Sequence, residues 1–397
     1  MFVGRSLTNL RIMNGLNRKQ LAEKLGVTEQ AVWQYENGYA APKLETINEL
    51  KNLFDVKSRF FYQEDLLSRQ NKECVNHNHI AYRAQERNSV QKTQMEKVHI
   101  EYIIAFLNLL SDKFQLPENN LRRLRDDVLK IMGTDLDEKE RIIQAAKYAR
   151  EFLGVDPNSN NDLLFCLEKN GAFVLEKAVN DKTDAYSLWS EDDMPYIMLG
   201  SSKGVAVRRN FDLAHELGHL LMHYKEEFSL QEKSVHNKFE QQADMFAGNF
   251  LLPESEIKRD LSKLHRISNP DSYLELKQKW GVSIQALGYR ARALGIMSEQ
   301  QFRYFYSQIN KKGYRKLEPF DLEIPLQRPG KIKSILQFLF ENKILKLDDI
   351  LWSLQVDEGF LSMLTGIDQE FFEKYRVQTS RTYSIQDFTN EGLNFGN

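Results

Sequence analysis

The sequence places two histidines and a glutamate in the pattern His215-Glu216-x-x-His219, inside an apolar, helix-prone run. On an α-helix, residues i and i+4 lie on one face, about 6 Å apart along the axis. His215 and His219 can therefore ligate a single metal ion, as in zinc sites. Glu216 would lie beside the ion, where its carboxylate can accept a proton from an attacking water. The alternative is a solvated helix face, which the apolar flanks disfavour.

A third ligand is expected downstream, because catalytic zinc sites usually combine three protein ligands with one open position. The segment 238–252 has apolar residues at helical spacing and ends at Pro253. Glu240 and Asp244 lie four residues apart on its polar side. We predict Glu240 as the third ligand and Asp244 as a carboxylate that orients a ligand histidine. The alternative is two solvated acids on an amphipathic helix.

The two segments together resemble the ImmA/IrrE family of metallopeptidases. Its members carry an R-x-x-F-x-x-A-H-E-L-G-H run, which here extends from Arg208 to His219, and then an E-x-x-A-[ND] motif, which here extends from Glu240 to Asp244. Over residues 160–300, the resemblance implies a thermolysin-like, gluzincin-type set of two histidines and a glutamate. It also implies that the substrate is a DNA-binding repressor, as is common in this family. Because two histidines and a carboxylate suit several divalent ions, we expect zinc and keep manganese as an alternative.

The first 66 residues alternate short amphipathic segments with turn signals. Asn17 and Thr28 can cap two successive helices that are separated by a glycine turn, which is the order of a helix-turn-helix. Residues 16–38 closely resemble the XRE family of lambda-type repressors and Cro proteins. Residues 44–54 and 58–61 would complete a five-helix domain.

Four residues at the start of the second helix would face base edges if the domain docks in the major groove as such domains do: Thr28, Glu29, Gln30 and Gln34. Glutamine can bond adenine and glutamate can accept from cytosine. Arg18 and Lys43 could contact phosphates. One domain reads a half-site, so double-stranded operator DNA would normally require a homodimer. A helical protein-interaction module of the same fold is the alternative, which Glu29 at a groove-facing position keeps open.

Three short apolar runs before the metal helix predict a small antiparallel sheet, at residues 171–176, 185–189 and 194–199. In zincin enzymes an edge strand binds the extended substrate by strand addition, and we predict 196–199 as that edge. A donor for the oxyanion is also needed. The candidates are His223, Tyr224 and His236, and the sequence does not choose among them.

The chain is thus expected to be mainly α, of the α+β class, in four parts. These are an XRE-type helix-turn-helix domain at 1–66, a helical connector at 67–155, a zincin-like metallopeptidase domain at 156–300 and a C-terminal helical region at 301–397. The last part shows no chemistry, so partner binding or dimerisation is its expected role.

Composition narrows the setting of the protein. The 397 residues carry a net charge of −2, which gives no global signature of nucleic-acid binding. The two cysteines, Cys74 and Cys166, lie far apart, which favours ordinary thiols in a reducing cytosol. No apolar run is long enough to span a membrane, so we expect a cytoplasmic protein without a membrane partner.

The main hypothesis is a DNA-binding transcriptional regulator fused to a zinc-dependent endopeptidase. It would hydrolyse a repressor-like protein in a phage, mobile-element or stress-response switch. One alternative is a transcription factor whose metal domain senses a ligand or metal without proteolysis, and Glu216 disfavours it because a structural site needs no general base. Another is an antitoxin or defence component that acts by protein contact. No organic cofactor is predicted.

Overall fold

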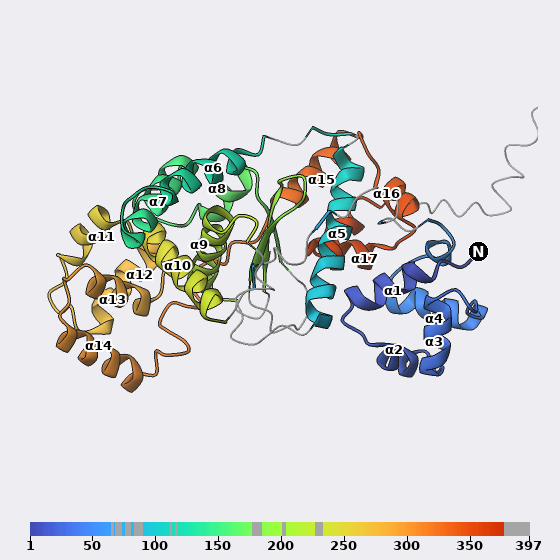
Figure 1. Cartoon of the computed structure of the whole chain (residues 1–397), viewed down its shortest axis with the longest axis horizontal. Helices are drawn as coiled ribbons and strands as arrows, with labels where there is room; N and C mark the ends of the chain where they lie inside the picture. Colours follow the sequence, from blue (N-terminus) through green and yellow to red (C-terminus); the bar gives the residue numbers. More distant parts are fainter. Residues whose placement is uncertain are drawn as a thin grey trace, which may run out of the picture.

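The computed structural model describes residues 1–64, 67, 74–75, 81–82, 90–111, 113–115, 118–176, 185–200, 204–226 and 233–376 (Figure 1). The predicted fold class is confirmed: helices dominate, and one small sheet lies between two helical regions. None of the described helices combines the length and the apolar character needed to cross a membrane. The predicted boundary at residue 66 lies outside the described residues, and all three domain boundaries stay predictions.

The helix-turn-helix domain forms as its capping residues predict. The Asn17 side chain accepts a hydrogen bond from Gln20 N at 2.8 Å, and Thr28 Oγ1 accepts one from Ala31 N at 3.1 Å. The fifth helix is a single 3-10 turn. The elements are α1 (Gly4–Met13), α2 (Arg18–Lys24), α3 (Glu29–Glu36), α4 (Leu44–Phe54) and η1 (Ser58–Phe61).

The sheet is mixed rather than antiparallel, which corrects the sequence prediction. Its strand order is β1-β3-β4-β2, with β2 parallel to β4 and the other two pairs antiparallel. The strands are β1 (Ala81–Tyr82), β2 (Phe173–Glu176), β3 (Tyr186–Trp189) and β4 (Pro195–Leu199). Alternating apolar residues identify strands but do not determine their order, since order depends on how the connections cross.

The predicted substrate edge at 196–199 is therefore wrong. These residues belong to β4, which pairs with β3 on one side and β2 on the other, so its backbone groups already serve the ladder. All five residues of β4 are buried, as expected for an inner strand. Strand addition at this sheet could occur only at an outer strand.

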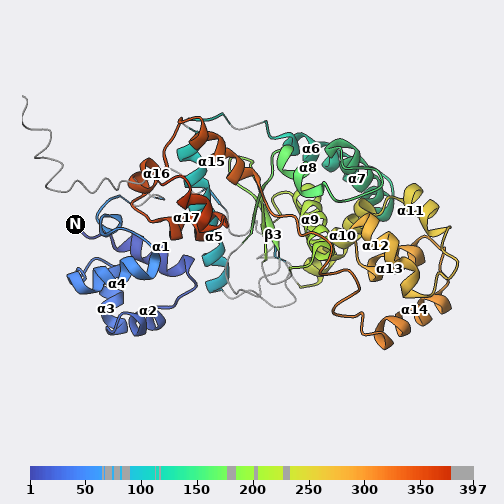
Figure 2. The same cartoon turned by 180° about the vertical axis from the view of Figure 1, so that it is seen from behind.

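The two faces of the sheet pack against two separate cores. One face joins the core shared by the N-terminal domain, α5 (Val90–Ser111) and the C-terminal helices, through Phe173, Leu175, Tyr186, Leu188, Tyr196 and Met198. The opposite face joins the core around α9 (Ala206–Met222), through Val174, Ala185, Trp189, Ile197 and Leu199. Figure 2 shows β3 between α5 and α9. The sheet thus separates the N-terminal domain from the predicted metal helix.

The helices of the predicted connector divide between these cores. Helix α5 (Val90–Ser111) packs against α1 and α17, whereas α6 (Asn120–Met132) and α7 (Glu138–Leu153) pack against α9 and α10. The predicted C-terminal region divides likewise, because α14 packs on α13 while the later helices join the first core. The remaining elements are α8 (Leu163–Lys169), α9 (Ala206–Met222), α10 (Lys233–Leu251), α11 (Glu254–Leu261), η5 (Pro270–Tyr273), α12 (Leu274–Trp280), α13 (Ile284–Ala293), α14 (Glu299–Lys311), α15 (Lys331–Glu341), α16 (Leu347–Leu354), α17 (Glu358–Thr365) and α18 (Gln369–Glu373).

Candidate metal centre and DNA-binding face

Helix α9 carries the predicted pair of histidines beneath the surface. His215 and Glu216 are fully buried, and His219 is 3 % exposed. The next helix, α10, can lie close because residue 218 is glycine: a Cβ there would stand 3.1 Å from the Phe246 ring and 3.4 Å from the Ala243 Cα. This close packing of α9 and α10 brings Glu240 to the histidines.

The three predicted ligands converge in space. One ligand atom from each of His215, His219 and Glu240 lies within 4.8 Å of the others. Glu240 carboxylate oxygens lie 3.5 Å from His215 Nε2 and 3.3 Å from His219 Nε2. The two Nε2 atoms are 3.1 Å apart. Two imidazoles and a carboxylate around one point form a donor set that suits a divalent metal ion.

The Nδ1 atoms of the two histidines contact neighbouring side chains, which leaves each Nε2 lone pair facing Glu240. His215 Nδ1 lies 2.9 Å from Asp244 Oδ1, and a carboxylate only accepts, so Nδ1 carries the proton and Nε2 of a neutral ring does not. This is the position that the sequence analysis predicts for Asp244. Such a carboxylate fixes the tautomer and orientation of a ligand histidine.

His223 orients the second ligand in the same manner. Its Nδ1 lies 3.0 Å from His219 Nδ1, and its Nε2 lies 2.8 Å from Gln242 Oε1. With Gln242 Oε1 as the acceptor, His223 donates from Nε2 and accepts from His219 Nδ1, so His219 Nε2 is left without a proton. The two Nε2 atoms lie 3.1 Å apart, and each is within 3.5 Å of a Glu240 carboxylate oxygen, so the three side chains together form a donor set that would suit a divalent cation.

Burial sets the charge states of the group. Desolvation lowers the pKa of His219 to about 4 and that of His223 to about 3. Burial would raise the pKa of Glu240, but the two neighbouring histidines, His215 and His219, outweigh it and lower that pKa well below the usual range. Neutral imidazoles and an ionised carboxylate are the protonation states that metal ligation requires.

Glu216 lies beside the ligands and against the sheet. The Ser187 hydroxyl, on β3, donates to Glu216 Oε2 at 2.7 Å, and among the described residues Glu216 Oε1 has no hydrogen-bond partner. Desolvation raises the pKa of Glu216 to about 7, despite the opposing effects of His215 and Ser187. A carboxyl with a pKa near neutrality suits a general base. Sequence reasoning missed Ser187, because a single serine in an apolar run does not indicate which helix residue it will contact.

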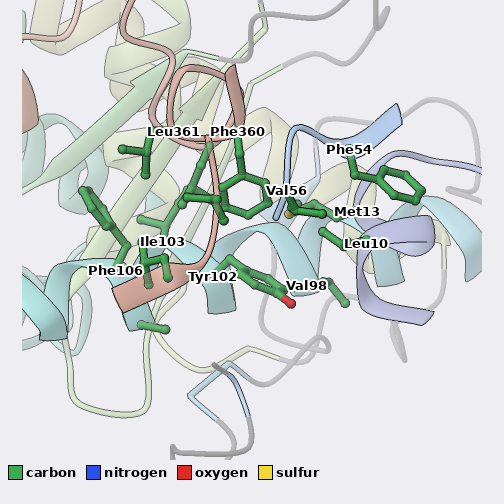
Figure 3. Packing of buried hydrophobic residues seen from close by; sticks show 14 of the residues in the cluster. Leu10, Met13, Phe54, Val56, Val98, Tyr102, Ile103, Phe106, Phe360 and Leu361 are labelled. Atoms are coloured by element: carbon green, nitrogen blue, oxygen red, sulfur yellow. The ribbon is translucent and has the colours of Figure 1, made fainter. Parts of the chain in front are cut away.

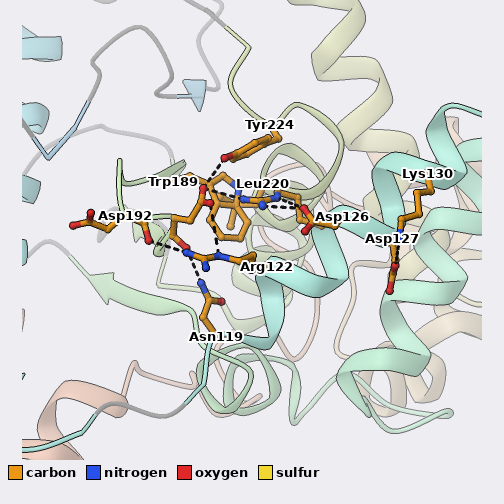
Figure 4. A network of polar contacts seen from close by, with 11 residues as sticks. Asn119, Arg122, Asp126, Asp127, Lys130, Trp189, Asp192, Leu220 and Tyr224 are labelled. Carbon is orange, nitrogen blue, oxygen red and sulfur yellow. Dashed lines mark hydrogen bonds and ion pairs between the residues drawn. The ribbon is translucent and has the colours of Figure 1, made fainter.

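The three oxyanion candidates lie in different environments. His223 is occupied by His219 and Gln242. The Tyr224 hydroxyl donates to Asp193 Oδ1 at 2.6 Å, and the Arg125 guanidinium lies 3.8 Å from its ring centroid, within the polar network that ties α6 to the β3–β4 turn (Figure 4). His236 is half-buried on α10, four residues before Glu240 and thus on the same helix face. The structure assigns the oxyanion role to none of them.

Most of the predicted DNA-contacting residues are exposed to solvent. Thr28, Glu29 and Gln30 are exposed at the start of α3, and Gln34 is half-exposed one turn later. Lys43 is exposed at the N-cap of α4. Arg18 is the exception, because its Nε lies 2.5 Å from Glu36 Oε2, within a buried ion network that includes Arg11. An aromatic pair missed by the sequence analysis, Trp33 stacked on Tyr39 at 5.1 Å, also lies on this side of α3.

Two parts of the chain match known families. Residues 7–61 match the helix-turn-helix family, and residues 167–292 match the IrrE N-terminal-like domain of the M78 peptidases. The second range contains α9 and α10, and therefore every residue of the convergent group. The family implies a metal ion and supports peptidase activity.

Two curated relatives match shorter parts of the chain. The HTH-type transcriptional regulator ImmR of Bacillus subtilis (strain 168) is 31 % identical over 71 residues, which is 18 % of this chain and 56 % of the relative. The SPbeta prophage-derived uncharacterized HTH-type transcriptional regulator YonR of the same strain is 35 % identical over 57 residues, which is 14 % of this chain and 53 % of the relative. The chain spans about half the length of these relatives. It combines a region that matches the helix-turn-helix family with a region that matches the IrrE N-terminal-like domain of the M78 peptidases.

Proposed function

We propose that this protein is a DNA-binding transcriptional regulator with a zinc-dependent endopeptidase that cleaves a repressor-like protein. The convergence of His215, His219 and Glu240, with the Glu216 carboxylate beside them, carries the proposal. The orientation of the two rings, with His215 Nδ1 held by Asp244 and His219 Nδ1 held by His223 while both Nε2 atoms face Glu240, supports it physically.

The chain's own residues have distinct tasks in this reaction. His215, His219 and Glu240 would hold the ion, and Asp244 and His223 would fix the two rings. The bound metal would supply electrophilic activation of the water and of the scissile carbonyl. Glu216 would take the proton from the attacking water and deliver it to the leaving amine.

Ser187 acts through Glu216 in this scheme. Its hydroxyl holds Oε2 at 2.7 Å, so the other oxygen, Oε1, is the one available to the water. Because Glu216 is fully buried, the hydrogen bond also limits the cost of its ionised form. We propose zinc over manganese, since two imidazoles with a carboxylate match the donor set of catalytic zinc.

The helix-turn-helix domain supports a repressor-like substrate at promoters. A peptidase tethered to DNA meets a neighbouring DNA-bound protein at an effective concentration far above its concentration in solution. The exposed start of α3, with Gln30 and Glu29, supplies the reading face for the operator.

The test incubates the zinc-loaded full chain with two probes, β-casein and purified ImmR of Bacillus subtilis. Cleavage of ImmR that disappears in Glu216→Gln, with metal content retained, is the expected result. Cleavage of casein alone would support a peptidase with another substrate class. If neither probe is cut and Glu216→Gln regulates a reporter as wild type does, while His215→Ala does not, the metal domain is a sensor and the peptidase proposal is wrong.

A further inference from the structure

Two segments 300 residues apart adopt the same local structure. Residues 47–61, the N-terminal hook, comprise most of α4, a left-handed residue, an extended valine and η1. Residues 347–361, the C-terminal hook, comprise α16, a left-handed residue, an extended valine and the first turn of α17. The first hook belongs to the DNA-binding domain, and the second lies outside both matched families.

The correspondence extends to single residues. Asp55 ends α4 at φ 52° and ψ 46°, and Gln355 ends α16 at φ 59° and ψ 43°. Val56 N donates to Lys51 O at 3.2 Å, and Val356 N donates to Leu351 O at 3.1 Å. Side chains buried in both hooks form the pairs Ile47 and Leu347, Leu50 and Ile350, Phe54 and Leu354, Val56 and Val356, Phe60 and Phe360, and Phe61 and Leu361.

The two hooks also bind each other, in a reciprocal manner. Val56 and Val356 form an antiparallel bridge. Figure 3 shows Val56 of the N-terminal hook beside Phe360 of the C-terminal hook. Lys57 N donates to Gln355 O at 2.8 Å, and the equivalent Asp357 N donates to Asp55 O at 2.9 Å. The Phe60 and Phe360 rings lie 6.3 Å apart. Each hook therefore presents to the other the same groups that it receives, as in a twofold-symmetric interface between identical chains.

We propose that the C-terminal hook imitates the N-terminal hook and covers the face through which two copies of this DNA-binding domain pair. A surface that binds a near-copy of itself by reciprocal bonds is self-complementary, so the N-terminal hook of a second chain fits the same face. The capped chain then presents a single DNA-binding domain, and displacement of the C-terminal hook lets two chains pair. The inference does not depend on peptide hydrolysis.

Charge favours the second copy over the internal imitation. Burial, and then the neighbouring Asp357 carboxylate, raise the pKa of Asp55. The residue equivalent to Asp357 in the N-terminal hook is Lys57, so a second copy would place an ammonium group where the internal contact places a like charge. The internal contact is thus the less favourable of the two electrostatically.

One residue makes the internal contact close. A Cβ at Gly359 would lie 2.5 Å from Asp55 Oδ2 and 2.7 Å from its Cγ. The equivalent residue in the N-terminal hook is Arg59. In a pair of N-terminal hooks, the exposed Asp55 carboxylate would rotate to make room for Arg59 of the second chain. The carboxylate would then lie beside a guanidinium, which carries the opposite charge.

The covered face lies away from the reading face. In both overall views, α2 and α3 lie below the rest of the N-terminal domain, and α16 and α17 lie above it (Figures 1 and 2). Capping therefore leaves the start of α3 exposed while it removes the pairing face. Because one domain reads one half-site, the cap would control binding to a two-half-site operator.

Disulfide trapping in the full chain tests the proposal. In a Cys74→Ser/Cys166→Ser background, Val56→Cys places one thiol where the axis between two N-terminal hooks would pass. A second variant carries both Val56→Cys and Val356→Cys. It reports the capped state through an internal disulfide, because the two valines face each other across the bridge. Gly359→Glu places a second carboxylate beside Asp55 and so opposes the cap by charge without altering the DNA-binding domain, and Gln369→Glu adds the same charge at an exposed position away from the hooks.

Under mild oxidation, Gly359→Glu should lower the yield of the internal disulfide and raise the covalent dimer of the Val56→Cys chain about tenfold. Gln369→Glu should change neither. Loss of the internal disulfide without dimers would overturn the proposal, as would equal dimer yields with and without Gly359→Glu. Phe360→Asp, which removes a buried anchor of the cap, is the second opening variant. If both variants keep the internal disulfide, the cap is not displaceable and the proposal fails.

Discussion

The ligand group on α9 and α10 lies under the surface, whereas the predicted base-contacting residues on α3 stand in solvent. His215 and Glu216 are fully buried, and their neighbours Asp244 and Ser187 hold them by hydrogen bonds. Glu29 and Gln30 are exposed at a helix start, and no such bond is seen to hold them in the described structure.

The difference determines how each surface tolerates change. A buried polar group that loses its partner keeps its full desolvation cost, so the metal centre should respond sharply to single substitutions. An exposed side chain that loses a base contact returns to water, so the DNA-binding face should respond in smaller, separable steps. The predictions below test this contrast.

The largest effect is expected at a ligand. His219→Ala should reduce bound metal by at least about 100-fold, because two ligands remain of three. Elemental mass spectrometry of the purified full chain measures it. His265→Ala, which removes an exposed histidine, is the matched control and should keep the metal. Equal metal content in the two variants would show that His219 is not a metal ligand.

A smaller loss of metal affinity is expected when the carboxylate that holds His215 is changed. Asp244→Asn keeps the size of the side chain but removes the charge that holds His215 Nδ1. Metal affinity should fall about 10-fold to 100-fold, measured by competition with a chelating dye. Unchanged affinity would mean that the tautomer of His215 is fixed without Asp244.

On the exposed side, Gln30→Ala should change selectivity rather than abolish binding. Once an operator has been selected from random DNA, the variant should lose about 1–3 kcal/mol of discrimination at one base pair. Lys43→Ala should instead weaken all sequences alike and reduce the salt dependence. Fluorescence anisotropy at several salt concentrations separates the two. If Gln30→Ala weakened binding to all DNA sequences alike, Gln30 would contact the DNA backbone and not a base.

The smallest effect is expected at the cap. Asp357→Asn removes the like charge beside Asp55, keeps a capping residue at the N-cap of α17 and should raise the free energy of unfolding by about 0.5 kcal/mol. Because the pKa of Asp55 is raised, its repulsion grows as the pH rises through that pKa, so the gain should shrink in acid. Urea unfolding at two pH values measures it, with the exposed Glu373→Gln as the control. An equal gain in the control would indicate a general charge effect.

The same contrast explains what the sequence could and could not predict. Helical spacing links His215 to His219, and Glu240 to Asp244, so the group was accessible from pattern alone. Ser187 was not, because its contact with Glu216 joins a strand to a helix 29 residues later. The order of the strands, and hence the inner position of 196–199, depends on crossovers that alternation does not encode.

The sequence also could not predict which of the two cores the helices of the connector and of the C-terminal region join. Their amphipathic helices were recognisable, but which core each face joins depends on contacts such as Val56 with Val356, 300 residues apart. Arg18 shows the same limit at short range, since its pairing with Glu36 requires two helices to be placed first.

The most direct test of the central claim is the metal content of wild type beside Glu240→Ala, with the exposed Glu373→Ala as control. The account predicts about one metal ion per chain in wild type and in the control, and almost none in Glu240→Ala. A wild-type chain that stays metal-free in the presence of added zinc would contradict it, and so would a Glu240→Ala variant that keeps its metal.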